Sequence, residues 1–172
     1  MLTCYTATSF SVTLRVIPTR QWSAEALTGV DFLSLPSIHS RLDVDVKIDP
    51  ALKGAFKTAH SGFTTPNGVL PSLLSGNVCV KQVYFLGPGG GVKRYPVTEE
   101  KIYIQSQVGC LDWARILLDL TYEFIKDYEE GHGYFPGTIP ALCFVEAAIA
   151  ESDGGKSFLI EEWISTVIAP HH

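Results

Sequence analysis

Polar and apolar residues alternate along several short segments of this chain, as they do in β-strands with one buried face. The clearest case is the segment 42–48, where four aliphatic residues alternate with charged ones. The segment 9–17 alternates in the same way. Shorter runs predict further strands at 55–62, 78–85, 142–150 and 157–164. Residues 151–155, Glu-Ser-Asp-Gly-Gly, predict a hairpin turn between the last two strands.

The pattern changes near Thr98, where a long helical stretch begins. Glu99 and Glu100 complement the partial positive charge of the helix N-terminus. Gly109 is a weak point at which the helix could divide, and residues 131–133 end it. Apolar residues recur at helical spacing at Leu111, Ala114, Leu118, Tyr122 and Ile125.

The order of these elements is several strands, one dominant helix and two strands. This order predicts an α+β fold, with a mostly antiparallel sheet and the long helix packed on one face of it. Residues 18–41 are expected to form a loop with one short helix at 23–27, and residues 64–77 a second loop. The glycine-rich residues 87–91 are expected to be a flexible connector.

The composition is that of a globular domain. Of the 172 residues, 46% are apolar and 18% are charged, which suits one domain with a sizeable core. The net charge of −5 disfavours a nucleic-acid surface, because such a surface normally needs a basic excess. A local cluster of cations would still suffice to hold one nucleotide.

The four cysteines occur singly, with neither Cys-x-x-Cys spacing nor an accompanying histidine cluster. We therefore expect no metal site and reduced thiols, which suits a cytoplasmic protein. No apolar run reaches the roughly 18 residues of a membrane helix. Residues 1–20 do not have the pattern of a signal peptide.

Lys81 is the residue that stands out, because it is a single cation within the apolar run 78–85. Burying its ammonium costs free energy unless it is paired or reaches water, and a phosphate group would be a good partner. A glycine-bearing segment at 53–62 precedes it, and the apolar run 157–164 downstream contains the acidic pair Glu161 and Glu162.

Each of these features also has a structural explanation. Lys81 could lie on an edge strand or point outward, Gly54 and Gly62 could serve a hairpin, and Glu161-Glu162 could belong to a strand that leaves the core. Adjacent carboxylates on a strand point to opposite faces, so only one of them can face a cleft. No Walker or Gly-x-Gly-x-x-Gly pattern is present.

Taken together, five segments resemble the alpha-type protein kinases, and especially the fungal (basidiomycete) members of that family. They are residues 54–60, 80–81, 111–125, 144–147 and 159–162. The resemblance runs from about residue 42 to 165 and covers the amino-terminal lobe of the family's domain. It divides the chain into an N-terminal extension at 1–41 and a kinase-like small lobe at 42–172 that stops near the hinge.

The resemblance implies a protein serine/threonine kinase that transfers the γ-phosphate of ATP with the help of magnesium. Gly54 and Ala55 would cover the phosphates, Lys81 would contact them, and Glu161, Glu162 and Trp163 would form the adenine hinge. The long helix would lie behind the site and could supply a carboxylate partner for Lys81. The side chains available for that role are Glu99, Glu100, Gln105, Gln107, Asp112 and Glu123, among which the sequence does not choose.

The family's catalytic and metal-binding segments, which follow the hinge, do not occur in these 172 residues. Phosphoryl transfer needs such groups, so we expect this chain by itself to be inactive and to bind ATP weakly. One alternative is a non-catalytic interaction module, whose surface facing the missing lobe is covered by residues 1–41 or by a protein partner. Another is an unrelated α+β enzyme or ligand binder, in which Lys81 would lie away from the other two segments.

Overall fold

The computed structural model describes residues 7–18, 31–45, 52–65, 74–133 and 140–164. These residues form one long helix and nine strands. The elements are β1 (Ala7–Val16), β2 (Ser37–Asp45), β3 (Leu52–Lys53), β4 (Lys57–Thr64), β5 (Gly76–Val83), β6 (Phe85–Leu86), β7 (Val92–Lys93), α1 (Val97–His132), β8 (Ala147–Ser152) and β9 (Ser157–Glu162).

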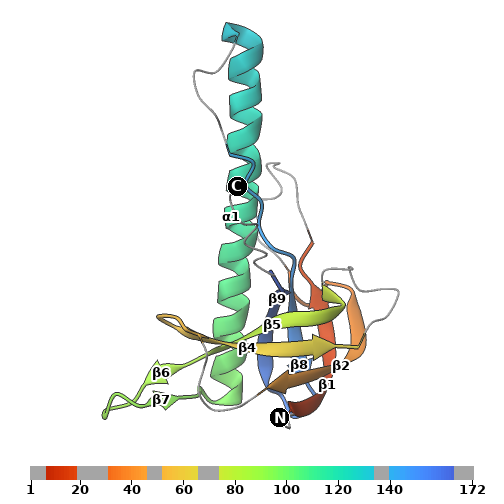
Figure 1. Ribbon diagram of the computed structural model, residues 1–172, viewed down its shortest axis with the longest axis vertical. Helices are drawn as coiled ribbons and strands as arrows, with labels where there is room; N and C mark the ends of the chain where they lie inside the picture. Colours follow the sequence, from red (N-terminus) through yellow and green to blue (C-terminus); the bar gives the residue numbers. More distant parts are fainter. Residues whose placement is uncertain (1–6, 19–30, 46–51, 66–73, 134–139, 165–172) are drawn as a thin grey trace, which may run out of the picture.

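Six antiparallel strands close into a barrel, in the order β2-β1-β8-β9-β5-β4, and α1 lies against its outside (Figure 1). The barrel closes where β2 pairs with β4, with Asp43 opposite Phe63. On the same edge of β4, the short β3 pairs with residues Thr58 and Ala59. The expected α+β class with an antiparallel sheet and one dominant helix is confirmed.

The closure of the sheet is a correction to the sequence-based expectation of a sheet that is simply covered by the helix. Gly62 contributes to it, since a Cβ atom at this position would lie 2.4 Å from Val80 Cγ2 and 3.3 Å from the Asp43 carbonyl oxygen. Strands can therefore approach closely here only because the residue has no side chain. Alternation of apolar residues does not report this contact, because it is the same in open and closed sheets.

The strands have two apolar faces, and each face belongs to a separate core. Side chains that point inward fill the barrel, among them Val80 of β5 and Phe158 of β9. Side chains that point outward pack under α1, among them Val83 and Leu159, which meet Ile104 of the helix. This double burial explains why the first four residues of β8 and residues 158–160 of β9 are continuous apolar runs in the sequence rather than alternating ones.

The helix α1 is continuous over 36 residues, about 54 Å at 1.5 Å per residue. It does not divide at Gly109, where no atom lies near the position of an added Cβ. Its buried residues all lie between Glu100 and Ile116, so its second half projects beyond the barrel (Figure 1). Glu100 lies in the first turn, and its buried carboxylate accepts a hydrogen bond from the Ser157 amide (3.1 Å).

Most of the expected strands are present with shifted ends, and two expectations are wrong: β2 begins at Ser37, inside the expected loop 18–41, and residues 142–146 of the expected strand 142–150 are not part of β8. The hairpin turn at 151–155 is confirmed and contains Gly155 at a φ of 83°. The glycine-rich residues 87–91 form the tip of the β6–β7 hairpin rather than a plain connector. The predicted helix at 23–27 lies outside the described residues.

Candidate functional site

Lys81 lies near the middle of β5, between β4 and β9. In the register it faces Ala59 on one side and Leu159 on the other. Its side chain is on the outer face of the barrel, the face that α1 covers, and is 27% exposed. There its Nζ donates a hydrogen bond to Oε2 of Glu161, whose side chain is 14% exposed. The two groups form a partly buried ion pair.

A second lysine shares this outer face. Lys57 is the first residue of β4, and its register partner is Val83 of β5. Partial burial lowers the pKa of the Lys57 ammonium, and the charge of Lys81 lowers it further, while Glu161 acts in the opposite direction. Glu161 is ion-paired with Lys81, and Lys57 feels the charges of both, so two lysines and one carboxylate lie on this face and favour a bound anion.

Cys79 completes this group on β5, two residues before Lys81. Burial raises the pKa of its thiol, Lys81 lowers it and Glu161 raises it, with a net increase. The thiol is therefore protonated at neutral pH and is not a nucleophile in the ground state. We name Lys57, Cys79, Lys81 and Glu161 together the β5 cluster.

The other residues expected at the site lie further away. Glu162 points to the face opposite Glu161, as strand alternation requires, and its Oε2 accepts a hydrogen bond from the Glu146 amide (3.4 Å). Trp163 follows the end of β9 and is 46% exposed. The acidic pair thus contributes one side chain to the β5 cluster.

Gly54 and Ala55 lie in the turn between β3 and β4. The Gly54 amide donates to the Lys57 carbonyl (2.9 Å), and its carbonyl accepts from the Tyr84 hydroxyl (2.6 Å). Tyr84 follows β5, whereas Glu162 pairs with Val78 near the start of that strand. The glycine turn and the expected hinge therefore lie at opposite ends of β5, about 20 Å apart at 3.3 Å per residue, with Lys81 between them.

The carboxylate partner of Lys81 comes from β9 and not from the helix. Glu100 is buried beside Ser157, and Asp112 is buried on the barrel side of α1. Glu161, expected in the adenine hinge, is instead the partner of Lys81, and Lys57 has no distinctive signal in the sequence. Strand alternation relates faces only within one strand, so the register of β5 with β9 is needed to show that Lys81 and Glu161 share a face.

The β5 cluster suits phosphate groups better than it suits a metal ion. Two ammonium groups on one face are appropriate donors for phosphate oxygens. Magnesium prefers several oxygen ligands, and Glu161 already accepts from Lys81. In the described part of the chain, no group of three or more His, Cys, Asp or Glu residues could hold a metal ion.

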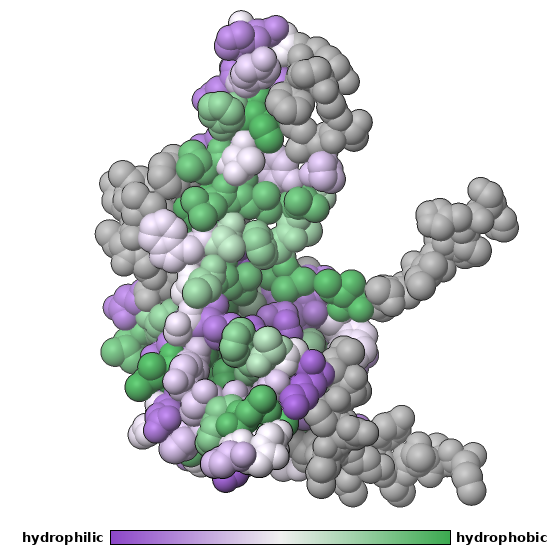
Figure 2. Space-filling view, turned by 90° about the vertical axis from the view of Figure 1, so that its left-hand side faces the viewer, coloured by the Kyte–Doolittle hydropathy of each residue, from purple (hydrophilic) through white to green (hydrophobic). Residues whose placement is uncertain are grey.

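A second candidate region is an apolar groove on the projecting half of α1. Its volume is about 490 Å³. Figure 2 shows hydrophobic residues gathered along this part of the helix, below its polar end. The groove is lined by Ala114, Leu117, Leu118 and Thr121 on the helix and by residues 142–144 on the opposite side.

Two side chains of α1 hold the opposite wall of this groove in place. The Tyr122 hydroxyl accepts from the Leu142 amide (2.6 Å) and donates to the Pro140 carbonyl (2.8 Å). Arg115 Nη2 donates to the Val145 carbonyl, and Arg115 is 8% exposed. Because the wall is fixed at both ends, the groove is formed before any partner arrives.

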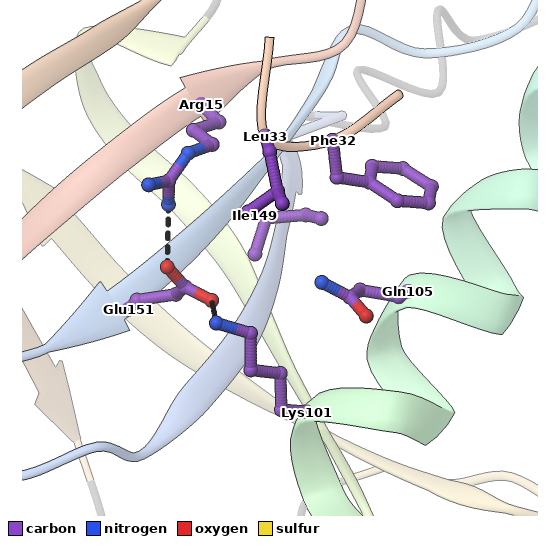
Figure 3. A pocket seen from close by; sticks show the side chains of 7 residues that line it. All are labelled: Arg15, Phe32, Leu33, Lys101, Gln105, Ile149 and Glu151. Atoms are coloured by element: carbon purple, nitrogen blue, oxygen red, sulfur yellow. Dashed lines mark hydrogen bonds and ion pairs between the residues drawn. The ribbon is translucent and has the colours of Figure 1, made fainter. Parts of the chain in front are cut away.

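A third cluster lies over the outer face of β1 and β8, where Glu151 accepts from both Arg15 and Lys101 (Figure 3). Burial works to raise the pKa of Glu151, but hydrogen bonds from Lys101 and Arg15 outweigh it and lower this pKa. The adjoining cavity has a volume of about 10 Å³. It has room for about one water molecule, so it does not serve as a ligand site.

Comparisons of the chain with protein-family models, with curated proteins and with solved structures found no match. No helix in the described part of the chain is long and apolar enough to cross a membrane.

Proposed function

We propose that this chain is the nucleotide-binding small lobe of an alpha-type protein serine/threonine kinase and that it does not transfer phosphate by itself. Lys81 and Lys57 would hold the phosphates of ATP on the outer face of β4 and β5. Glu161 would keep the Lys81 ammonium in position until the nucleotide arrives.

The observation that carries this proposal is the strand order β4-β5-β9. Segments that are about 20 and 80 residues from Lys81 in the sequence are its two neighbours in the sheet. An accidental likeness of separate segments would not need them to be adjacent. A phosphate group at Lys57 would also favour the charged ammonium, whose pKa is lowered first by burial and then by repulsion from Lys81.

Two features limit the proposal to binding. The closed barrel differs from the sheet expected of a kinase small lobe, so the proposal rests on the neighbours of Lys81 and not on the fold. The single carboxylate of the β5 cluster, Glu161, already accepts from Lys81, and in the described residues no group of three or more His, Cys, Asp or Glu side chains could hold magnesium. A second lobe would have to supply the groups that hold magnesium, and ATP would contact only part of its full site.

The test is a titration of ATP, with and without magnesium, followed by NMR amide shifts. We expect saturable shifts around Lys81 with a dissociation constant of about 1 mM or weaker, equivalent to about 4 kcal/mol. Lys81→Ala should abolish these shifts. Lys126→Ala is the matched control, since it removes one lysine from the exposed end of α1 and should leave ATP binding unchanged.

Glu161→Gln tests whether Glu161 competes with ATP for the Lys81 ammonium. It frees the Lys81 ammonium and removes a negative charge, so ATP should bind several-fold more tightly than to the wild type. A folded protein with no saturable shifts would refute nucleotide binding. A submillimolar, magnesium-dependent dissociation constant would refute the claim that the site is incomplete.

The second candidate function is a non-catalytic protein-interaction module. The apolar groove on α1 favours it, because exposed apolar side chains in a preformed groove are typical of interaction surfaces. The two functions use different parts of the molecule and can be tested separately.

A further inference from the structure

We infer that the projecting half of α1, together with residues 142–144, is a docking groove for an amphipathic helix that carries basic residues. This inference rests on the second candidate function and names its class of partner. It does not depend on the β5 cluster.

The apolar stripe on α1 has the spacing of a coiled-coil seam. Its members follow one another at alternating intervals of three and four residues, as in a heptad repeat. Leu117 is 51% exposed and Phe124 is 69% exposed, so the stripe faces solvent. The stripe consists of Ala114, Leu117, Thr121, Phe124 and Tyr128.

This stripe is too elongated for a compact ligand. From Ala114 to Tyr128 it spans fourteen residues, about 21 Å at 1.5 Å per residue. An amphipathic helix of similar length would cover it with side chains at every third or fourth position, which is the helix-in-groove mode of recognition. The wall at residues 142–144 gives such a helix a second surface to contact.

The charge of the helix end points to a basic partner. Residues 117–132 contain five acidic residues and one lysine, a net charge of −4 out of −5 for the whole chain. Four of these acids, Glu123, Asp127, Glu129 and Glu130, are exposed. Acidic side chains near a helix C-terminus oppose the helix dipole, and a cationic partner would relieve that repulsion.

The same charge argues against a second copy of this chain as the occupant. Two copies paired through this stripe would bring two half-helices of net charge −4 together. A partner with lysine or arginine beside its apolar positions would fill the apolar groove, meet Asp127 at the edge of the stripe and be attracted by the net negative charge of the helix end.

The probe is a synthetic helical peptide of 21 residues, with leucine at the two core positions of each heptad and lysine at the flanking positions. A matched peptide carries glutamate in place of every lysine. We expect fluorescence anisotropy to show at least tenfold tighter binding of the lysine peptide. Equal binding of both peptides would overturn the assignment of a basic partner.

The matched protein variant is Leu117→Gln with Phe124→Gln, which removes apolar surface and keeps every charge. Both side chains are exposed, so the variant should fold. It should bind the lysine peptide at least tenfold more weakly than the wild type. If it binds equally well, the peptide is held by charge alone and the groove is not a docking site.

Cys143 lies in the groove wall and reports where the peptide binds. We expect the lysine peptide to slow alkylation of Cys143 by iodoacetamide in the wild type but not in the variant. Unchanged alkylation would place the peptide elsewhere and overturn the inference. Sedimentation of the free protein tests the alternative that a second copy of this chain fills the groove. A wild-type dimer that becomes a monomer in the variant would support that alternative and overturn the inference.

The variant also separates this inference from the nucleotide site. Leu117→Gln with Phe124→Gln should leave the ATP titration unchanged, whereas Lys81→Ala should leave peptide binding unchanged. Loss of both activities in either variant would show that the two sites are not independent and would overturn the inference as stated.

Discussion

Lys81 and Glu161 form an ion pair across two strands although they are not opposite one another in the register. Lys81 faces Leu159, and Glu161 faces Cys79, so the pair is diagonal. A diagonal pair needs a long side chain, and lysine supplies it. Because Lys57 lies on the same face, the carboxylate neutralises only one of the two lysine charges there.

The energetic coupling of Lys81 and Glu161 is expected to be modest. Both side chains are partly exposed, so water screens their attraction, and we expect about 1 kcal/mol of stabilisation from the pair. The measurement is a double-mutant cycle in urea with Lys81→Met and Glu161→Gln. A coupling near zero would mean that the pair is unimportant for stability and leaves Lys81 available to a ligand at no cost.

Gly62→Ala should destabilise the barrel by about 1–3 kcal/mol, because the added methyl group overlaps Val80 Cγ2. Urea denaturation measures the loss. Gly89→Ala is the matched control, since nothing lies within 4 Å of its added Cβ, and it should change the free energy of unfolding by less than about 0.5 kcal/mol. Equal effects of the two substitutions would contradict the close approach of β4 and β5 at Gly62.

The stability of the fold should fall as the pH drops below the ordinary histidine pKa of 6.5. Burial lowers the pKa of His60, and the neighbouring Arg94 lowers it further. Because the unfolded chain then binds this proton more readily than the folded chain, acid favours unfolding. Denaturation at pH 7.5 and 5.5 should show a smaller pH effect in His60→Gln than in the wild type. An identical pH dependence in the two proteins would exclude His60 as its source.

Tyr122→Phe should loosen the wall of the apolar groove. It removes the hydroxyl that accepts from the Leu142 amide and donates to the Pro140 carbonyl, each worth about 1 kcal/mol. Hydrogen exchange at the Leu142 amide should accelerate by about tenfold or less, since tenfold corresponds to about 1.4 kcal/mol. The Val145 end of the wall, which Arg115 holds, should keep its exchange rate; acceleration along the whole wall would show that Tyr122 holds both ends.

Local sequence patterns predicted the elements of the fold well, because they depend on spacing within one segment. The end of the strand Ser37–Asp45 is visible as alternation of apolar and charged residues from Leu42 on, although residues 37–41 are expected in a loop from the sequence, and the helix Val97–His132 is visible as apolar residues at helical spacing. Closure of the barrel depends instead on a contact between β2 and β4 at Gly62. A single glycine has many structural uses, so its role there could not be recognised without the strand order.

Only part of the candidate site could be predicted, because local sequence patterns do not show which strands pair. Lys81 is conspicuous because it is a cation within an apolar run. Its partner is not conspicuous, since Glu161 is 80 residues away and the sequence contains many carboxylates. Lys57 gains its significance only from sharing the outer face with Lys81. Pairing between distant strands fixes these relationships, and sequence spacing does not report it.

The position of β8 and β9 between β1 and β5 has a consequence for how the protein folds as it is synthesised. Until Ala147–Glu162 leave the ribosome, β1 and β5 each have an unpaired edge. Open edges can pair with strands of other chains, and contacts between residues as distant as Arg15 and Glu151 form slowly. The open edges of β1 and β5 are therefore exposed to aggregation until β8 and β9 are made, and chaperone binding to them during that interval would protect the chain.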